Sequence, residues 1–130
     1  MARNATELFA QFVYSVELSY DSLMERESEL KTSFTAILEQ HGGEFIHFEE
    51  MGDTMRAQCA FARYEEDLFH DICDDIAPQM DSFVEARFLF VDKDVNSLHI
   101  FVINNGRWQE SCLRLPEAGP LSRALLDKAG

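Results

Sequence analysis

The feature that most constrains the fold of this chain is a strict alternation of side chains near its N-terminus. Along residues 8–20, every second position is apolar or aromatic: Leu8, Ala10, Phe12, Tyr14, Val16, Leu18 and Tyr20. Successive side chains of a β-strand point to opposite faces of a sheet, so this period of two predicts a strand with one face on a hydrophobic core. We therefore expect a strand from Leu8 to Tyr20.

Two stretches with helical spacing follow. Ser22 with Glu25 three residues later is typical of a helix start, and Gly42-Gly43 is typical of a helix end, so a helix is expected over residues 22–41. A second apolar stripe lies ahead of Pro78, which cannot continue a helix, and predicts a helix over residues 65–77. The remaining apolar runs predict five further strands, at residues 45–51, 54–64, 83–91, 98–104 and 107–115.

The order of these elements is β-α-β-β-α-β, extended by two strands. It predicts an α+β fold of the ferredoxin-like (split β-α-β) class, a two-layer sandwich whose antiparallel sheet is extended by a C-terminal β-hairpin. Asn105-Gly106 is the expected turn of that hairpin. A short last helix is expected after Pro120, with Leu121, Leu125 and Leu126 on one face. No linker or repeat interrupts the chain, so residues 1–130 are expected to form a single domain.

The strands expected at 83–91 and 98–104 are apolar on both faces. Phe88 and Phe90 alternate with Leu89 and Val91, and the second strand repeats the pattern. Strands of this kind are normally buried on both sides, yet two helices cover only one face of a sheet. We expect a second copy of the chain to cover the other face, as a homodimer. Coverage by the short last helix is the alternative.

The balance of charge restricts the classes of partner. The chain has 24 Asp and Glu against 11 Lys and Arg, a formal net charge of −13. This excess argues against direct binding of a nucleic-acid backbone and against docking on an anionic membrane. No stretch reaches the length of a membrane span, and the first residues lack a signal-peptide pattern. Three widely spaced cysteines do not suggest a disulfide framework, so a cytoplasmic location is expected.

Much of the negative charge lies in the middle of the sequence. Residues 44–81 hold eleven acidic residues and only two basic ones. We expect a non-enzymatic interaction protein that presents an acidic surface to a basic protein partner, because such a surface steers encounter. The alternative is that these side chains only keep the protein soluble. The residues expected to form the surface are Glu49, Glu50, Asp67, Asp71, Asp74 and Asp75.

A second class of function needs an interior pocket instead of a surface. The chain has no nucleophile elbow, Gly-rich phosphate loop or zinc-protease motif, so no catalytic residue is assigned. A small-molecule-binding domain or a cofactor-independent enzyme could still use a pocket beside the sheet, with Tyr14, His47 and His99 as its polar groups. The run Asp92 to Asn96 begins like a calcium loop but lacks its later ligands, so no metal site and no cofactor are expected.

Overall fold

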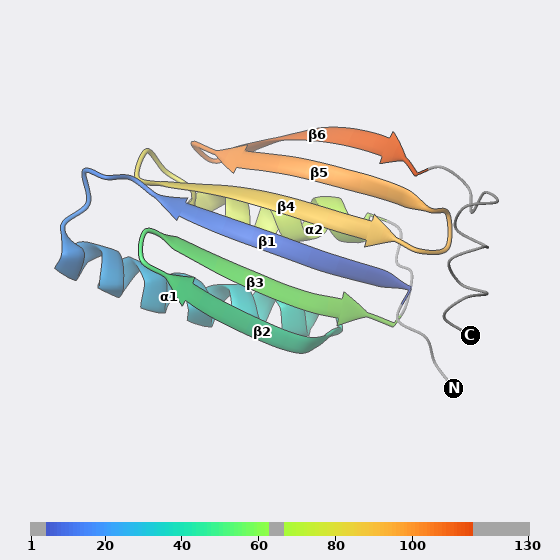
Figure 1. Ribbon diagram of the computed structural model, residues 1–130, viewed down its shortest axis with the longest axis horizontal. Coiled ribbons are helices and arrows are strands. Elements are labelled where there is room, and N and C mark those ends of the chain that lie inside the picture. The colour runs from blue at the N-terminus through green and yellow to red at the C-terminus, as the bar shows by residue number, and fades with distance from the viewer. Residues whose placement is uncertain (1–4, 63–66, 116–130) are drawn as a thin grey trace, which may run out of the picture.

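The computed structural model describes residues 5–62 and 67–115, which form a six-stranded antiparallel sheet with both helices on one of its faces (Figure 1). The strand order is β2-β3-β1-β4-β5-β6. Along the chain the elements are β1 (Thr6–Tyr14), α1 (Tyr20–Gln40), β2 (Gly43–Met51), β3 (Thr54–Phe61), α2 (Leu68–Ile76), a 3-10 turn (Ala77–Gln79), β4 (Val84–Asp92), β5 (Ser97–Asn104) and β6 (Arg107–Arg114).

The predicted fold class, a ferredoxin-like two-layer sandwich with a C-terminal helix, is wrong. The described chain is mostly sheet, since β5 and β6 continue it beyond β4 by hairpins. The two helices are also unequal: α1 has 21 residues, whereas α2 has only 9 because Pro78 lies so close behind it. The last helix, predicted on Leu121, Leu125 and Leu126, lies outside the described residues.

The first strand is shorter than its alternation predicts. It ends at Tyr14, and Val16 and Tyr20 are 92% and 75% exposed, so their apolar character does not mark a core face. The helix α1 begins at Tyr20 because Ser19 caps it: the Ser19 hydroxyl accepts a hydrogen bond from the Ser22 N–H at 3.2 Å. The expected cap at Ser22 is therefore one turn too late.

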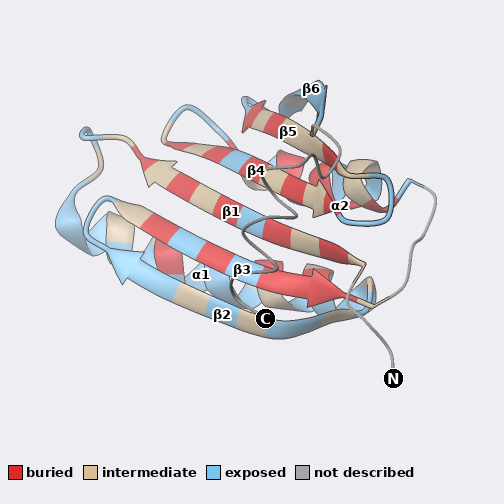
Figure 2. Cartoon of the chain, turned by 45° about the vertical axis from the view of Figure 1, so that its right-hand side comes forward, coloured by how far each residue is buried: buried red, intermediate tan, exposed pale blue. Residues whose placement is uncertain are grey.

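The core lies between the sheet and the helices, and buried residues alternate with less buried ones along β1 and β4 (Figure 2). Its centre is a group of fully buried phenylalanines from three strands and α1. The Phe34 ring of α1 lies 5.2 Å from Phe12 and 5.2 Å from Phe88, and Phe90 lies 5.6 Å from Phe101. Contacts between rings add to the stabilisation that burial gives, and those of Phe34 fix α1 across β1 and β4.

The other face of the sheet, here called the open face, is formed by the alternate positions of the same strands. The register Ala86↔Ile103 and Phe88↔Phe101 sets Leu89, Ile100 and Val102 on the open face, where they are half-buried. Within the described residues, both helices pack on the opposite side. Neither helix in this part of the chain combines the length and the apolar character that crossing a membrane requires.

Candidate functional site

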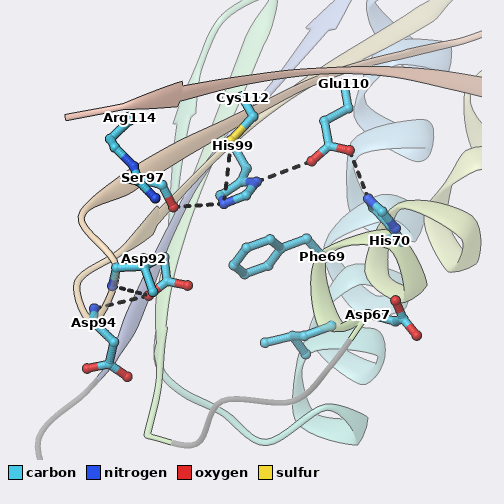
Figure 3. A pocket seen from close by; sticks show the side chains of 12 residues that line it. Asp67, Phe69, His70, Asp92, Asp94, Ser97, His99, Glu110, Cys112 and Arg114 are labelled. Carbon is cyan, nitrogen blue, oxygen red and sulfur yellow. Dashed lines mark hydrogen bonds and ion pairs between the residues drawn. The ribbon is translucent and has the colours of Figure 1, made fainter.

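A large hollow lies on the helix side of the sheet, between the first turn of α2 and the strands β4 to β6 (Figure 3). We call it the His99 cleft, and its volume of about 760 Å³ is in the range of small-molecule sites. The described residues that line it are Asp67, Leu68, Phe69, His70, Asp92, Asp94, Val95, Ser97, His99, Glu110, Cys112 and Arg114. Three of them, His70, Glu110 and His99, are linked by hydrogen bonds.

His99 is at the centre of a chain of hydrogen bonds along the wall of the cleft. Its Nε2 lies 2.9 Å from the Oγ of Ser97, and its Nδ1 lies 3.2 Å from Oε2 of Glu110. The other carboxylate oxygen of Glu110 lies 2.9 Å from Nε2 of His70. Figure 3 shows the four side chains in this order, from β5 through β6 to α2. The connectivity is hydroxyl, imidazole, carboxylate, imidazole.

The protonation of these hydrogen-bonded side chains follows from the carboxylate of Glu110, which accepts from both histidines. Burial alone would raise the pKa of Glu110, but hydrogen bonds from His70 and His99 outweigh it and hold the pKa below its ordinary value. An ionised carboxylate only accepts hydrogen bonds, so His70 donates from Nε2 and His99 donates from Nδ1. The Nε2 of a neutral His99 then carries a lone pair, and the Ser97 hydroxyl donates to it. This is the arrangement in which an imidazole can remove a proton from a hydroxyl.

The hairpin turn between β5 and β6 brings these side chains together. Asn105 and Gly106 both adopt positive φ angles, 48° and 75°, which a two-residue hairpin turn requires. The turn sets His99 opposite Cys112, and Glu110 lies two residues before Cys112 on the same face of β6. Ser97 and His99 are two residues apart on β5 and therefore also share a face.

Contacts of Phe69 and His70 fix the opposite wall of the cleft. The Phe69 ring of α2 stacks on Phe90 at 4.3 Å and lies 4.9 Å from the His99 ring. The His70 ring stacks on Trp108 at 4.9 Å, and the Trp108 Nε1–H donates to Oδ1 of Asp74 at 2.7 Å. These contacts anchor α2 to β4 and β6, so that His70 reaches Glu110 from across the cleft.

The cysteines differ in their access to the cleft. Cys59 and Cys73 are buried, and burial raises the pKa of both thiols, that of Cys59 to about 12, which keeps them protonated and unreactive. Cys112 is exposed and lines the cleft, with its Sγ 4.0 Å from Nε2 of His99. It is a second nucleophile within reach of the same imidazole, although Ser97 lies closer.

The three predicted pocket residues do not meet. Only His99 points into the His99 cleft. His47 lies on the open face, where it borders a smaller hollow beside Phe9, and Tyr14 is buried on the helix side at the end of β1. The prediction therefore named one residue of the His99 cleft and did not name Ser97, Glu110 or His70, which also line it.

The six predicted acidic residues are not brought to one surface. Glu49 pairs in register with Arg56 on the open face, whereas Glu50 contacts Lys31 of α1 at 3.0 Å. On α2, Asp74 accepts the bond from Trp108, and Asp75 lies 3.0 Å from Nε2 of His41. Asp67 precedes α2 and Asp71 is exposed in its first turn. Three of the six thus have a contact within the fold, and binding of a basic protein stays a prediction.

The carboxylate expected to begin a calcium-like loop has a structural role. Asp92 is buried, and its Oδ1 accepts hydrogen bonds from the backbone N–H groups of Asp94 and Val95 at 3.0 and 3.4 Å. These bonds close the β4–β5 turn from within. Within residues 5–62 and 67–115, no group of three or more His, Cys, Asp or Glu side chains is arranged to hold a metal ion.

No protein-family model matches this chain, and no curated protein matches it either. Any function of the His99 cleft therefore has to follow from its own geometry.

Proposed function

We propose that this protein binds a small molecule in the His99 cleft and cleaves an ester or a similar acyl bond in it. The observation that carries the proposal is the hydrogen-bonded series Ser97–His99–Glu110, with distances of 2.9 and 3.2 Å, in the wall of a cleft of about 760 Å³. A nucleophile, a base within hydrogen-bonding reach of it and a third group that orients the base are the components of nucleophilic catalysis on acyl groups.

Each residue has one role in this proposal. The Ser97 oxygen attacks the acyl carbon while His99 Nε2 takes the hydroxyl proton, and His99 then returns that proton to the departing alcohol. Water, deprotonated by the same imidazole, releases the acyl group from Ser97 in a second step. Glu110 keeps the Nδ1 of His99 protonated and stabilises the imidazolium that forms. His70 holds the carboxylate of Glu110 from the other side.

The first turn of α2 borders the same cleft, and the N-terminal end of a helix carries a partial positive charge. The first hydrogen bond of this helix runs from the Asp71 N–H to the Asp67 carbonyl at 2.9 Å. The N–H groups of Leu68, Phe69 and His70 precede it, at the end of the helix that carries a partial positive charge. Groups of this kind stabilise negative charge, and such a charge develops on the carbonyl oxygen of the substrate during acyl transfer.

The test is the hydrolysis of p-nitrophenyl acetate by the purified chain, together with labelling by a fluorophosphonate. Replacing Ser97 with Ala or His99 with Ala should lower kcat/KM about 100-fold or more, because each removes one partner of the proton transfer. Glu110→Gln should also lower it while leaving Ser97 in place. His47→Ala is the matched control, since it removes an exposed histidine from the other face and should change nothing.

Two results would contradict the proposal. Hydrolysis that continues unchanged in both Ser97→Ala and His99→Ala would show that the cleft is not the reacting site. Loss of hydrolysis in Cys112→Ser with full retention in Ser97→Ala would assign the nucleophile to the thiol 4.0 Å from His99 Nε2 and refute the role of Ser97.

A further inference from the structure

The open face has a partly exposed apolar area at its centre. Its centre is a continuous apolar area on β1, β4 and β5, made of Phe9, Leu89, Val91, Leu98, Ile100 and Val102. The area continues onto β6 at Leu113, which is 54% exposed, and Phe9 is 42% exposed. Apolar areas of this extent on a soluble protein usually mark a binding surface.

The charges of the open face are almost balanced. By the register of the strands it carries four carboxylates, from Glu7, Glu44, Glu49 and Glu85, and three guanidinium groups, from Arg56, Arg87 and Arg107. The chain as a whole has a net charge of −13, so nearly all of the excess negative charge lies elsewhere. The open face is therefore the one sheet surface on which two copies of this acidic protein can meet without strong repulsion.

The size of the face also suits a second copy. Six strands spaced about 4.8 Å apart, each eight or nine residues long at about 3.3 Å per residue, give a projected face of roughly 750 Å². A stable interface buries about 800 Å² on each partner. Only contact over most of the open face reaches that size, which favours packing of sheet on sheet over contact through a single edge strand.

We propose that two copies of this chain pack their open faces together, with the apolar residues of β1, β4 and β5 at the centre and the balanced charges around them. Two sheets in such an arrangement lie about 10 Å apart with their side chains interdigitated. The His99 cleft is on the other side of each sheet, so both clefts stay accessible. The proposal does not depend on the chemistry assigned to the cleft.

Sedimentation equilibrium of the full chain between 1 and 100 μM tests this inference. The expected mass is twice 14.9 kDa. Val102→Glu should weaken self-association about 30-fold or more, because it places a charge within the apolar area of both faces. Val16→Glu is the matched control, since it makes the same change at a valine that is 92% exposed in the loop before α1, and it should leave the dimer intact.

Leu113→Glu is the second variant, in case Val102→Glu fails to fold. Leu113 is more exposed, so a charge there costs the monomer little, and circular dichroism confirms that each variant is folded. A wild-type monomer at 100 μM would overturn the proposal and leave residues 116–130 or another protein to cover the face. A dimer that survives both folded variants would also overturn it, since its interface would lie elsewhere.

Discussion

Glu27 provides a direct test of how the helix side of the sheet is packed. It lies on α1 and is only 5% exposed, and its Oε2 has no hydrogen-bond partner within the described residues. The hydroxyl of Tyr14 is also buried, and it too has no hydrogen-bond partner within the described residues. Burial, and after it the negative charge of Glu50, raises the pKa of the Glu27 carboxyl, while Tyr14 and Lys31 offset this only in part. Its ionised form is therefore disfavoured in the folded protein.

The sign of the pH effect follows from this shift. The folded carboxyl keeps its proton to a higher pH than the unfolded one, whose pKa is 4.5, so the folded state binds more protons between the two values. The free energy of unfolding should therefore fall as the pH rises from about 4.5 through the folded pKa. Above that range the protein carries a buried carboxylate whose charge is poorly compensated.

Replacing Glu27 with Gln removes the charge and keeps the shape. An unsatisfied buried polar group costs about 1–3 kcal/mol. Because Lys31 compensates the charge in part, we expect a gain in stability at pH 7 in the lower half of that range, with a rise in Tm of about 3–10 °C. Urea unfolding at pH 4 and pH 7 measures it, and the gain should be much smaller at pH 4, where the wild-type carboxyl is protonated.

The control for this measurement is Glu29→Gln, an exposed position two residues further along α1. It also removes one negative charge from an acidic chain, and so reports the general relief of repulsion. Two outcomes would contradict the structure: a gain in the free energy of unfolding for Glu27→Gln that is no larger than for the control, or a gain that is equal at both pH values. Either would mean that the carboxyl of Glu27 is not a buried group with a poorly compensated charge.

Two further substitutions test local packing. Gly43→Ala should destabilise the protein by about 1–3 kcal/mol in urea unfolding, because a Cβ there would lie 2.9 Å from the Leu38 carbonyl oxygen; unchanged stability would contradict the close approach of β2 to the end of α1. Asp74→Asn should cost about 0.5–1.5 kcal/mol and shift the fluorescence of Trp108, the only tryptophan, because it weakens the bond from the indole. Asp71→Asn, on the same helix but exposed, should change neither quantity appreciably.

The strands could be predicted from sequence far better than the points where they end. Period-two alternation is a direct consequence of a half-buried strand, and together with the apolar runs and turn signals it located all six strands to within a few residues except at the end of β1. There the alternation continues by coincidence through Val16 and Tyr20, while one hydroxyl, that of Ser19, decides where α1 begins. A capping bond of about 1 kcal/mol outweighs a pattern that no core residue confirms.

Part of the candidate site could also have been found without a structure. A two-residue turn at Asn105-Gly106 pairs residue 104 with 107, and counting outward from that pair sets His99 opposite Cys112, with Glu110 as its diagonal neighbour. This calculation needs only the turn signal and the antiparallel register. The contribution of His70 could not be found in this way, since it depends on how α2 packs against Trp108 and Phe90, which no local pattern encodes.

The strand β5 explains why both proposals arise from one short segment. Its even-numbered side chains, Leu98, Ile100 and Val102, lie on the open face, and its odd-numbered side chains lie on the helix side. On that second side Phe101 and Ile103 belong to the core, whereas Ser97 and His99 lie beyond the core, where the cleft begins. A charge at Val102 should therefore dissociate the dimer without changing ester hydrolysis, and His99→Ala should abolish hydrolysis without changing the mass in solution. A variant that moved both quantities together would mean that the two faces of β5 are not independent, and that the cleft needs the second copy to keep its shape.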